Sequence, residues 1–403
     1  MKQLFILALL FITVGHTSRA QSAEEKLDQK LDSISKLDGL AGFGVSVFTL
    51  NTVLFQGGFG YADLKNKKPY TVATVQNIGS ISKTFTGIAL MKAVEMGKLS
   101  MDTRVNEILP FKVVHPKHPE QQITIRHLAT HTSGIIDLEQ TYDMSYVLEN
   151  PNEVDADEYN KEITKYMHQL KQNTAMPLGA YLKAYLTKGG ALYNRKNFLK
   201  TAPGARYEYS NIATALAAYC VEIVMEEPFH KVTQKYIFDE IGMSETGWFL
   251  DSVSKENHAQ IYSDNLKVLP RYQLITYPDG GLRTNVASLT KYMQVMMGCY
   301  EGRESILPTA LCQQMMKAQL TQSQLGTEDI DDNYGFYWEN KGGATIGHNG
   351  GDPGILTLMY YNTEMKVGAI FFTNTNVIDN PKAAKLVQQS WNAIRAYRNK
   401  KAK

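Results

Sequence analysis

A serine and a lysine stand three residues apart in the segment 76–87, where a polar turn runs into an apolar stretch with helical spacing. This pattern predicts Ser80 at the N-terminus of a helix, with Lys83 one turn later on the same face. An amine held beside a hydroxyl can activate the serine as a nucleophile. The helix would also direct its unpaired N–H groups and positive dipole end at an oxyanion formed there.

The Ser-x-x-Lys spacing occurs four times in this chain, so the spacing alone does not identify a site. The copy at Ser33 lies in a charged amphipathic segment, the copy at Ser252 in a polar loop, and the copy at Ser288 is expected to start a surface helix. Only the copy at Ser80 joins a glycine-containing turn to an apolar helix, as the floor of a buried cleft requires.

A tyrosine and an asparagine stand at the mouth of a second apolar helix. Tyr209 and Asn211 follow a Pro-Gly turn and come directly before the helix predicted over 212–225. The Tyr-x-Asn pattern recurs at Tyr360 and Tyr397, in a predicted strand end and a basic helix. Only Tyr209 follows a turn that would present its side chain to a cleft.

The third candidate segment is His348-Asn349-Gly350-Gly351, in a predicted strand. Glycines inside a strand allow a ligand or another backbone to approach closely. The histidine could contact a substrate in such a cleft, with a reference pKa of about 6.5. The alternative is a histidine that only satisfies hydrogen bonds at a strand end.

The sequence lacks the residue patterns of two other kinds of catalytic site, a zinc site and a nucleophile elbow. His127 and His131 have the four-residue spacing of a helical zinc site, but the glutamate of His-Glu-x-x-His is missing and no third ligand is evident. The Gly-x-Ser-x-Gly motif of a nucleophile elbow is absent. We therefore expect neither a metal nor another cofactor.

The bulk composition is that of an ordinary globular protein: 403 residues, 43% hydrophobic, with a formal net charge of +2. This balance gives no indication of a nucleic-acid partner or a polybasic membrane surface. Residues 1–20 combine a lysine, an apolar stretch over 4–14 and a small-x-small sequence at 18–20. They predict a cleaved signal peptide, export to the periplasm or outside the cell, and no membrane anchor after cleavage; an uncleaved anchor is the alternative.

An exported protein with three cysteines can form at most one internal disulfide. Cys220 lies in an apolar helical stretch and is expected to be a buried hydrophobe. Cys299 and Cys312 could pair, but their spacing does not decide this.

The elements that must position these residues change character along the chain. Apolar spacing predicts a helix over 22–40, followed by strands at 43–50 and 53–59. From about residue 95 the pattern is mainly helical, and it returns to strands and a final helix after residue 325.

The predicted class is therefore α/β (α+β), with an antiparallel sheet flanked by helices. Residues 22–95 and 325–403 are expected to form a discontinuous α/β lobe, and 96–324 a mostly helical lobe inserted between them. Within that lobe, the polar and aromatic-rich residues 137–200 are typical of an insertion, which either caps a cleft or is a surface excursion.

The three motifs are more specific together than apart. Their order resembles that of the class C β-lactamase-like serine hydrolases, through Ser80-x-x-Lys83, Tyr209-x-Asn211 and His348-x-Gly350. That family includes β-lactamases, D-alanyl-D-alanine carboxypeptidases, D-amino-acid peptidases and esterases, and it has a serine β-lactamase/transpeptidase-like fold. The likeness covers nearly all of the chain after the predicted signal peptide.

The resemblance implies a role for each residue. Ser80 would be the nucleophile that becomes acylated, Lys83 would help to remove its proton, and Tyr209 would act as general base and later as proton donor. Asn211 would bind the acyl-side amide of the substrate. The backbone N–H groups of Ser80 and Gly351 would form the oxyanion hole.

The third motif departs from the β-lactamase pattern, because class C β-lactamases carry Lys-Thr-Gly where this chain has His348-Asn349-Gly350. Histidine is a weaker cation at neutral pH and would hold a substrate carboxylate less well. His348 and Gly350 are therefore expected to bind an ester or peptide substrate. A class C-like β-lactamase is the first alternative, and a non-catalytic binding protein with this fold is the second.

Overall fold

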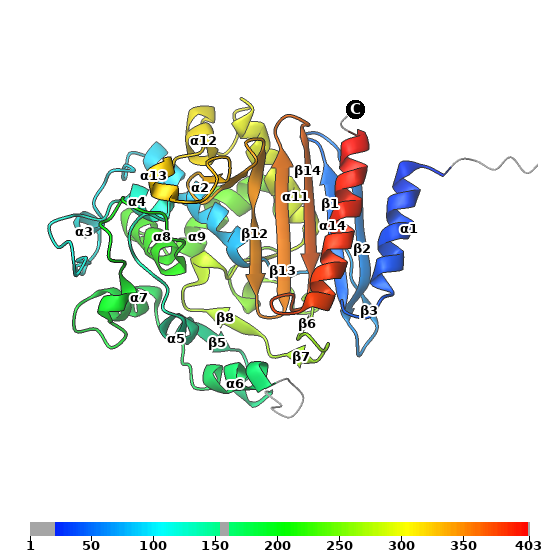
Figure 1. Cartoon of the computed structure of the whole chain (residues 1–403), viewed down its shortest axis with the longest axis horizontal. Helices are drawn as coiled ribbons and strands as arrows, with labels where there is room; N and C mark the ends of the chain where they lie inside the picture. Colours follow the sequence, from blue (N-terminus) through cyan, green and yellow to red (C-terminus); the bar gives the residue numbers. More distant parts are fainter. Residues whose placement is uncertain (1–20, 154–160, 402–403) are drawn as a thin grey trace, which may run out of the picture.

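A computed structural model describes residues 21–153 and 161–401. The predicted signal peptide lies outside the described residues. At the centre is an eight-stranded antiparallel sheet with the order β10-β11-β12-β13-β14-β1-β2-β3 (Figure 1). Its strands are β1 (Gly42–Phe48), β2 (Val53–Asp63), β3 (Lys68–Pro69), β10 (Asn333–Tyr334), β11 (Glu339–Lys341), β12 (Thr345–Asp352), β13 (Ile355–Asn362) and β14 (Val367–Thr373).

Strands from the two ends of the chain meet in the middle of this sheet. β1 pairs with β14 in the register Val45↔Phe371, and β1 also pairs with β2. The predicted antiparallel sheet flanked by helices is thereby confirmed. The chain between β3 and β10 forms most of the helices, most of which lie to the left of the sheet in Figure 1, with α11 behind it.

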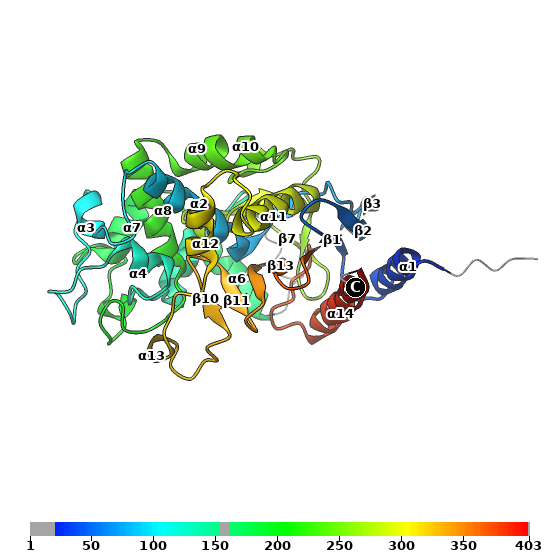
Figure 2. The same cartoon turned by 90° about the horizontal axis from the view of Figure 1, so that it is seen from above.

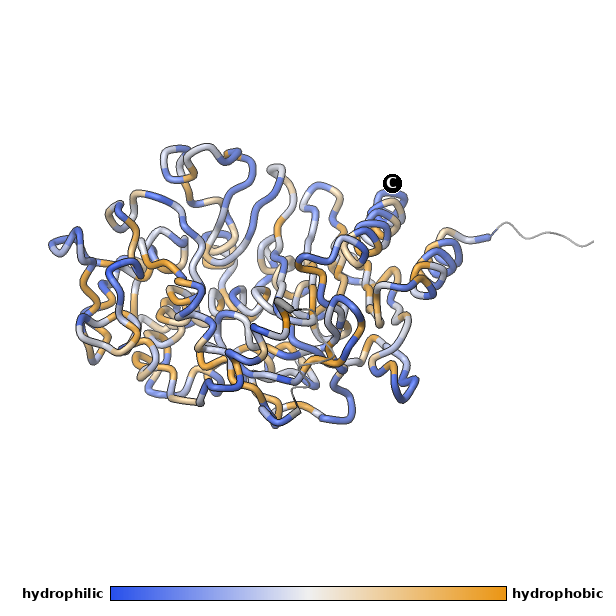
Figure 3. The backbone as a smooth tube through the Cα atoms, turned by 60° about the horizontal axis from the view of Figure 1, so that its bottom comes forward, coloured by the Kyte–Doolittle hydropathy of each residue, from blue (hydrophilic) through white to orange (hydrophobic). Residues whose placement is uncertain are grey.

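Two terminal helices cover one face of the sheet, and central helices cover the other. On β14, Ala369 and Phe371 pack with α1 (Ala23–Ser35) and α14 (Pro381–Lys401), whereas Ile370 and Phe372 point into the core on the opposite face. Figure 2 shows α1 and α14 side by side, away from α2 and α11. In Figure 3 hydrophilic and hydrophobic residues alternate along both terminal helices, as expected for helices with one buried face.

Helix α1 is shorter than the sequence predicted. It begins with a capping box formed by Ser22 and Glu25, and it ends at Ser35 rather than near Gly39. The buried stripe stops at Ile34, and Leu37 is 49% exposed, so a further turn would bury no additional apolar side chain.

The long, buried α2 contacts α8, α9 and α12, and the same part of the chain forms three two-stranded sheets (β4 with β9, β5 with β8, β6 with β7). Among the described residues, none of the helices combines the length and the apolar run needed to cross a bilayer. The helices are α2 (Ser82–Glu95), α3 (Val105–Ile108), α4 (Ile125–Ala129), α5 (Glu139–Tyr142), α6 (Lys161–Leu170), α7 (Leu178–Leu186), α8 (Asn211–Met225), α9 (Phe229–Thr233), α10 (Asp239–Ile241), α11 (Val286–Tyr300), α12 (Thr309–Met316) and α13 (Gln322–Leu325). The short strands are β4 (Gln76–Asn77), β5 (Tyr146–Leu148), β6 (Ile261–Tyr262), β7 (Val268–Leu269), β8 (Tyr272–Leu274) and β9 (Arg283–Thr284).

The cysteine pairing that the spacing left open is decided by the fold. Cys299 on α11 and Cys312 on α12 form a disulfide, with their Cα atoms 6.0 Å apart. Cys220 is a buried free thiol on α8, as predicted.

Strand β12 packs against the turn that precedes α2. The Thr357 hydroxyl on β13 donates to the carbonyl oxygen of Ile78 at 2.7 Å, and it also lies 3.2 Å from the carbonyl oxygen of Gly350. A Cβ atom on Gly350 would come within 2.0 Å of the Ile78 oxygen, whereas one on Gly351 would meet only ordinary contacts at 3.7 Å and beyond. Gly350 is therefore required for the sheet and the turn to touch.

Replacing these neighbouring glycines separately tests that packing. We expect Gly350→Ala to lower the free energy of unfolding by at least about 2 kcal/mol, because two backbone segments must separate. Gly351→Ala, the matched control, should change it by less than about 1 kcal/mol. Urea unfolding of both variants measures the difference, and equal stabilities would show that the close approach is not required.

Candidate active site

Ser80 lies in the 3₁₀ turn Gly79–Ile81, directly before α2. Gly79 has a φ of +53°, in the left-handed region that favours glycine. A Cβ atom on Gly79 would approach the backbone nitrogen of Gly351 to 3.0 Å. The turn therefore places a half-buried Ser80 at the N-terminal end of α2, close to the backbone of β12.

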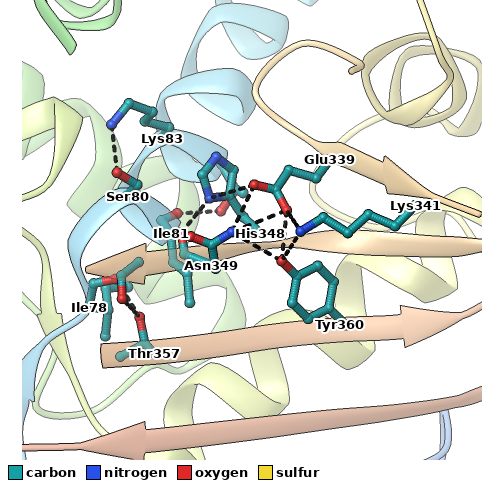
Figure 4. A network of polar contacts seen from close by, with 12 residues as sticks. Ile78, Ser80, Ile81, Lys83, Glu339, Lys341, His348, Asn349, Thr357 and Tyr360 are labelled. Carbon is teal, nitrogen blue, oxygen red and sulfur yellow. Dashed lines mark hydrogen bonds and ion pairs between the residues drawn. The ribbon is translucent and has the colours of Figure 1, made fainter. Parts of the chain in front are cut away.

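The Lys83 side chain is fully buried among three acceptors. Its Nζ atom is 3.0 Å from Ser80 Oγ, 2.6 Å from Asn211 Oδ1 and 2.6 Å from the carbonyl oxygen of Asp279. Figure 4 shows the Ser80 and Lys83 side chains directed at each other. The amide and carbonyl oxygens can only accept, so a neutral amine would give them its two N–H groups and keep its lone pair for the Ser80 hydroxyl.

The environment of Lys83 makes its proton easier to lose. Burial lowers the pKa of Lys83, and the carboxylates of Asp279, Asp137 and Asp352 act in the opposite direction without reversing the shift. The amine is thus easier to deprotonate than that of a free lysine.

Tyr209 completes the group around the Ser80 hydroxyl. Lys83 Nζ lies 4.9 Å from the centre of the Tyr209 ring, and the centres of the Tyr209 and His348 rings are 6.3 Å apart. Burial raises the pKa of Tyr209 well above its usual value, although a hydrogen bond with Ser80 opposes the shift. The phenol is therefore protonated at neutral pH and can donate its proton, while its role as general base stays a prediction.

His131, which the sequence suggested only as half of an unfavoured zinc pair, packs on Tyr209. Their rings stack with centroids 4.5 Å apart. His131 Nδ1 accepts a hydrogen bond from the Ser210 N–H at 3.2 Å, and its carbonyl oxygen accepts one from the Glu208 N–H at 2.8 Å. His131 thereby fixes the backbone on both sides of Tyr209, a contact that no local spacing could have revealed.

No metal-binding cluster accompanies these histidines. His127 instead accepts a hydrogen bond from the Thr124 N–H as part of a helix cap. Within 21–153 and 161–401, no group of three or more His, Cys, Asp and Glu side chains is placed to hold a metal ion.

Asn211 is the first residue of α8, and a buried carboxylate holds that helix end in place. Asp137 accepts hydrogen bonds from Ser210 Oγ at 2.8 Å, the Asn211 N–H at 2.6 Å and the Ile212 N–H at 3.0 Å. Burial raises the pKa of Asp137, and these hydrogen bonds oppose the shift. Asp137 therefore orients Asn211 toward Lys83, and sequence reasoning missed it.

His348 lies on β12, 2% exposed, with a buried glutamate beside it. Its Nδ1 atom donates to the Asn349 carbonyl oxygen at 2.5 Å and is 4.0 Å from Glu339 Oε1 (Figure 4). Burial lowers the pKa of His348, with Glu339 acting against the shift and Lys83 reinforcing it. The imidazole is thus neutral at pH 7. Glu339 was not identified from the sequence.

Residues of the predicted insertion reach the site. Tyr142 donates a hydrogen bond to Asp279 Oδ1 at 3.1 Å, and Tyr146 donates one to Asp352 Oδ1 at 2.6 Å. Burial raises the pKa of Asp279 to about 7 and that of Asp352 to about 6. Asp279 lies in the turn whose carbonyl oxygen accepts a hydrogen bond from Lys83, and Asp352 lies on β12, the strand that carries Gly351. This part of 137–200 therefore contacts the elements that position the site residues.

The other Ser-x-x-Lys copies do not pair their two side chains. Ser33 donates to the Gln29 carbonyl, Ser252 to the Phe249 carbonyl and Ser288 to the Ser244 carbonyl. The prediction that Ser288 starts a surface helix was wrong: Ser288 is 1% exposed, and α11 contacts α12 and the sheet strands β1 and β14.

Three comparisons relate the chain to known proteins. Penicillin-binding protein 4* of Bacillus subtilis (strain 168) is 23% identical over 332 residues, covering 80% of this chain and 65% of that protein. The octameric penicillin-binding protein homologue from Pyrococcus abyssi has a TM-score of 0.66 at 25% identity, covering 88% of this chain and 73% of that chain. EstCE1, a hydrolase with promiscuous acyltransferase activity, has a TM-score of 0.65 at 20% identity, covering 92% and 99%.

The chain spans about two thirds of the length of its curated relatives. The family model described as Beta-lactamase matches residues 27–389, which is most of the sequence. The chain therefore belongs to the Beta-lactamase family, a family of serine hydrolases.

Proposed function

We propose that the protein is an exported serine hydrolase that cleaves an ester or an amide through an acyl-enzyme on Ser80. The observation that carries this proposal is the position of the buried Lys83 Nζ, 3.0 Å from Ser80 Oγ with its other acceptors neutral. A binding protein has no need of an amine poised to accept a serine proton. A small-molecule ester or a D-amino-acid or D-alanyl peptide is the proposed substrate class.

The proposed reaction begins with proton transfer from Ser80 Oγ to the Lys83 amine as the oxygen attacks the substrate carbonyl carbon. The N–H groups of Ser80 and Gly351 stabilise the oxyanion. Tyr209 donates its phenolic proton to the leaving alcohol or amine and is reprotonated from Lys83. Water then releases the acyl group from Ser80, and Asn211 holds the acyl-side amide where one is present.

Export is part of the proposal. Its support is the signal-like pattern over 1–20 and the Cys299–Cys312 disulfide, since disulfides persist mainly outside the reducing cytosol.

Substrate preference rests on His348. A buried, neutral imidazole offers no cation to a substrate carboxylate, so an esterase or peptidase fits the site better than a β-lactamase. The likeness to EstCE1, a hydrolase of the same fold, supports an esterase. The penicillin-binding relatives support the β-lactamase alternative, which is therefore tested as well.

A fluorophosphonate probe tests the proposed function. It should add mass to the peptide that contains residues 77–87, because Ser80 is the activated hydroxyl. Ser80→Ala should abolish the adduct, and Ser288→Ala, the matched control in a second Ser-x-x-Lys copy, should retain it. Mass spectrometry of the digested protein locates the label. A label on another serine, or none, would contradict the proposal and favour the binding-protein alternative.

Replacing His348 tests substrate preference. His348→Lys should raise the kcat/KM ratio of a cephalosporin to a short-chain ester by about tenfold or more, because a permanent cation would then meet the carboxylate. His348→Gln, which stays neutral, should leave the ratio unchanged. In the unmodified protein the ratio should rise only as the pH falls below about 6.5, because burial lowers the pKa of His348. The ratio is measured between pH 5 and pH 9, a range chosen to span the titration. If the lysine variant had the same ratio as the unmodified protein throughout this range, residue 348 would not meet the charged end of the substrate.

A further inference from the structure

A groove of about 430 Å³ opens on the sheet beside α14, between that helix and strands β11 to β13. Figure 1 shows why it is open: α14 lies over β14 and β1, and none of the helices drawn there lies in front of β12 and β13. A volume of this size suits a small organic ligand.

The groove and the Ser80 cleft lie on opposite faces of one strand. Neighbouring residues of β12 point to opposite sides, so Asn349 lines the groove while His348 lies near Tyr209. Glu339 joins the two: it accepts hydrogen bonds from Asn349 at 3.1 Å and from the groove residue Tyr360 at 2.7 Å, and it lies beside His348 (Figure 4). The groove is therefore separate from the Ser80 cleft, and Glu339 contacts residues of both.

One wall of the groove is apolar. It includes Leu358 and Tyr360 from β13 and Trp391 from α14. The Tyr360 and Trp391 rings are 6.2 Å apart in an edge-to-face arrangement, and Trp391 is only half-buried. This wall could cover a flat or branched hydrocarbon body.

Two arginines without counter-ions line the groove next to Trp391 on α14. Trp391, Arg395 and Arg398 follow one another at i, i+4 and i+7, so they share a face of α14. Arg398 is 8% exposed, and its Nε atom has no hydrogen-bond partner. Within the described chain, neither Arg395 nor Arg398 forms an ion pair. The third cation of the groove, Lys341, is paired with Glu339 at 2.9 Å.

A buried guanidinium nitrogen without a hydrogen-bond partner, such as Nε of Arg398, is costly until an acceptor reaches it. The planar fork of an arginine matches a carboxylate in particular. We propose that this groove binds a small amphiphilic carboxylate, with its carboxylate on Arg398 and Arg395 and its apolar body on Leu358, Tyr360 and Trp391. This site is independent of the chemistry proposed for Ser80.

Titration calorimetry with 2-naphthoate, and with 2-naphthamide as its neutral isostere, tests the site on the full chain. We expect 1:1 binding of 2-naphthoate, with the amide bound about tenfold or more weakly. Arg398→Met, which keeps the apolar stem, should weaken naphthoate binding by about tenfold or more, and Arg395→Gln by several-fold. Lys385→Gln, which removes an exposed cation of α14 outside the groove, should leave the affinity unchanged.

Four results would overturn the proposal. Equal affinity for acid and amide would mean a merely apolar pocket, and insensitivity to both arginine variants would place the ligand elsewhere. If no binding were detected, the groove would not be a binding site. If the protein self-associated and the arginine variants did not, a second copy of the chain would fill the groove. Should Arg398→Met fail to fold, Arg395→Gln alone decides, because Arg395 is exposed and its loss leaves the core intact.

Discussion

One buried amine, that of Lys83, links the start of α2 to α8 and to the turn before β9. The acceptors of Lys83 come from the start of α8 and from the turn before β9, 128 and 196 residues away along the chain. A buried lysine is costly unless its donors are bonded and its charge is paired or removed. Within the described chain, Lys83 has no carboxylate hydrogen-bonded to it, and its partners are neutral oxygens. The structure therefore satisfies the donors without pairing the charge, and burial lowers the pKa of Lys83, which favours a base for Ser80.

Buried acids surround that amine without neutralising it directly. Asp137 is bonded to the N-terminus of α8, and Asp279 and Asp352 are bonded to tyrosines of the insertion. Burial raises the pKa of Asp279 to about 7, although Lys83 opposes the shift. The three carboxylates raise the pKa of Lys83 but do not outweigh its burial. The insertion thus contributes to the electrostatics of the cleft through hydrogen bonds of Tyr142 and Tyr146.

The sequence was informative where the determining contacts are local. The spacing of Ser80 and Lys83 on one helical turn and the turn before Tyr209 each depend on neighbours within a few residues. His131, Asp137 and Glu339 could not be found in this way, because their partners are fixed only by the packing of distant elements. The pairing of Cys299 with Cys312 depended likewise on how α11 and α12 pack. Ser288 was placed on the surface because a polar start of a helix does not reveal that both of its sides are covered.

The pKa of Lys83 in the folded protein is the most direct measure of this account. It can be followed by NMR titration of the ¹³Cε resonances of labelled lysines, with Lys83→Met identifying the signal. We expect a pKa below the reference of about 10.4, because desolvation outweighs the surrounding carboxylates. A pKa at or above that reference would contradict the account, since Lys83 would then hold its proton firmly and could not accept the one from Ser80.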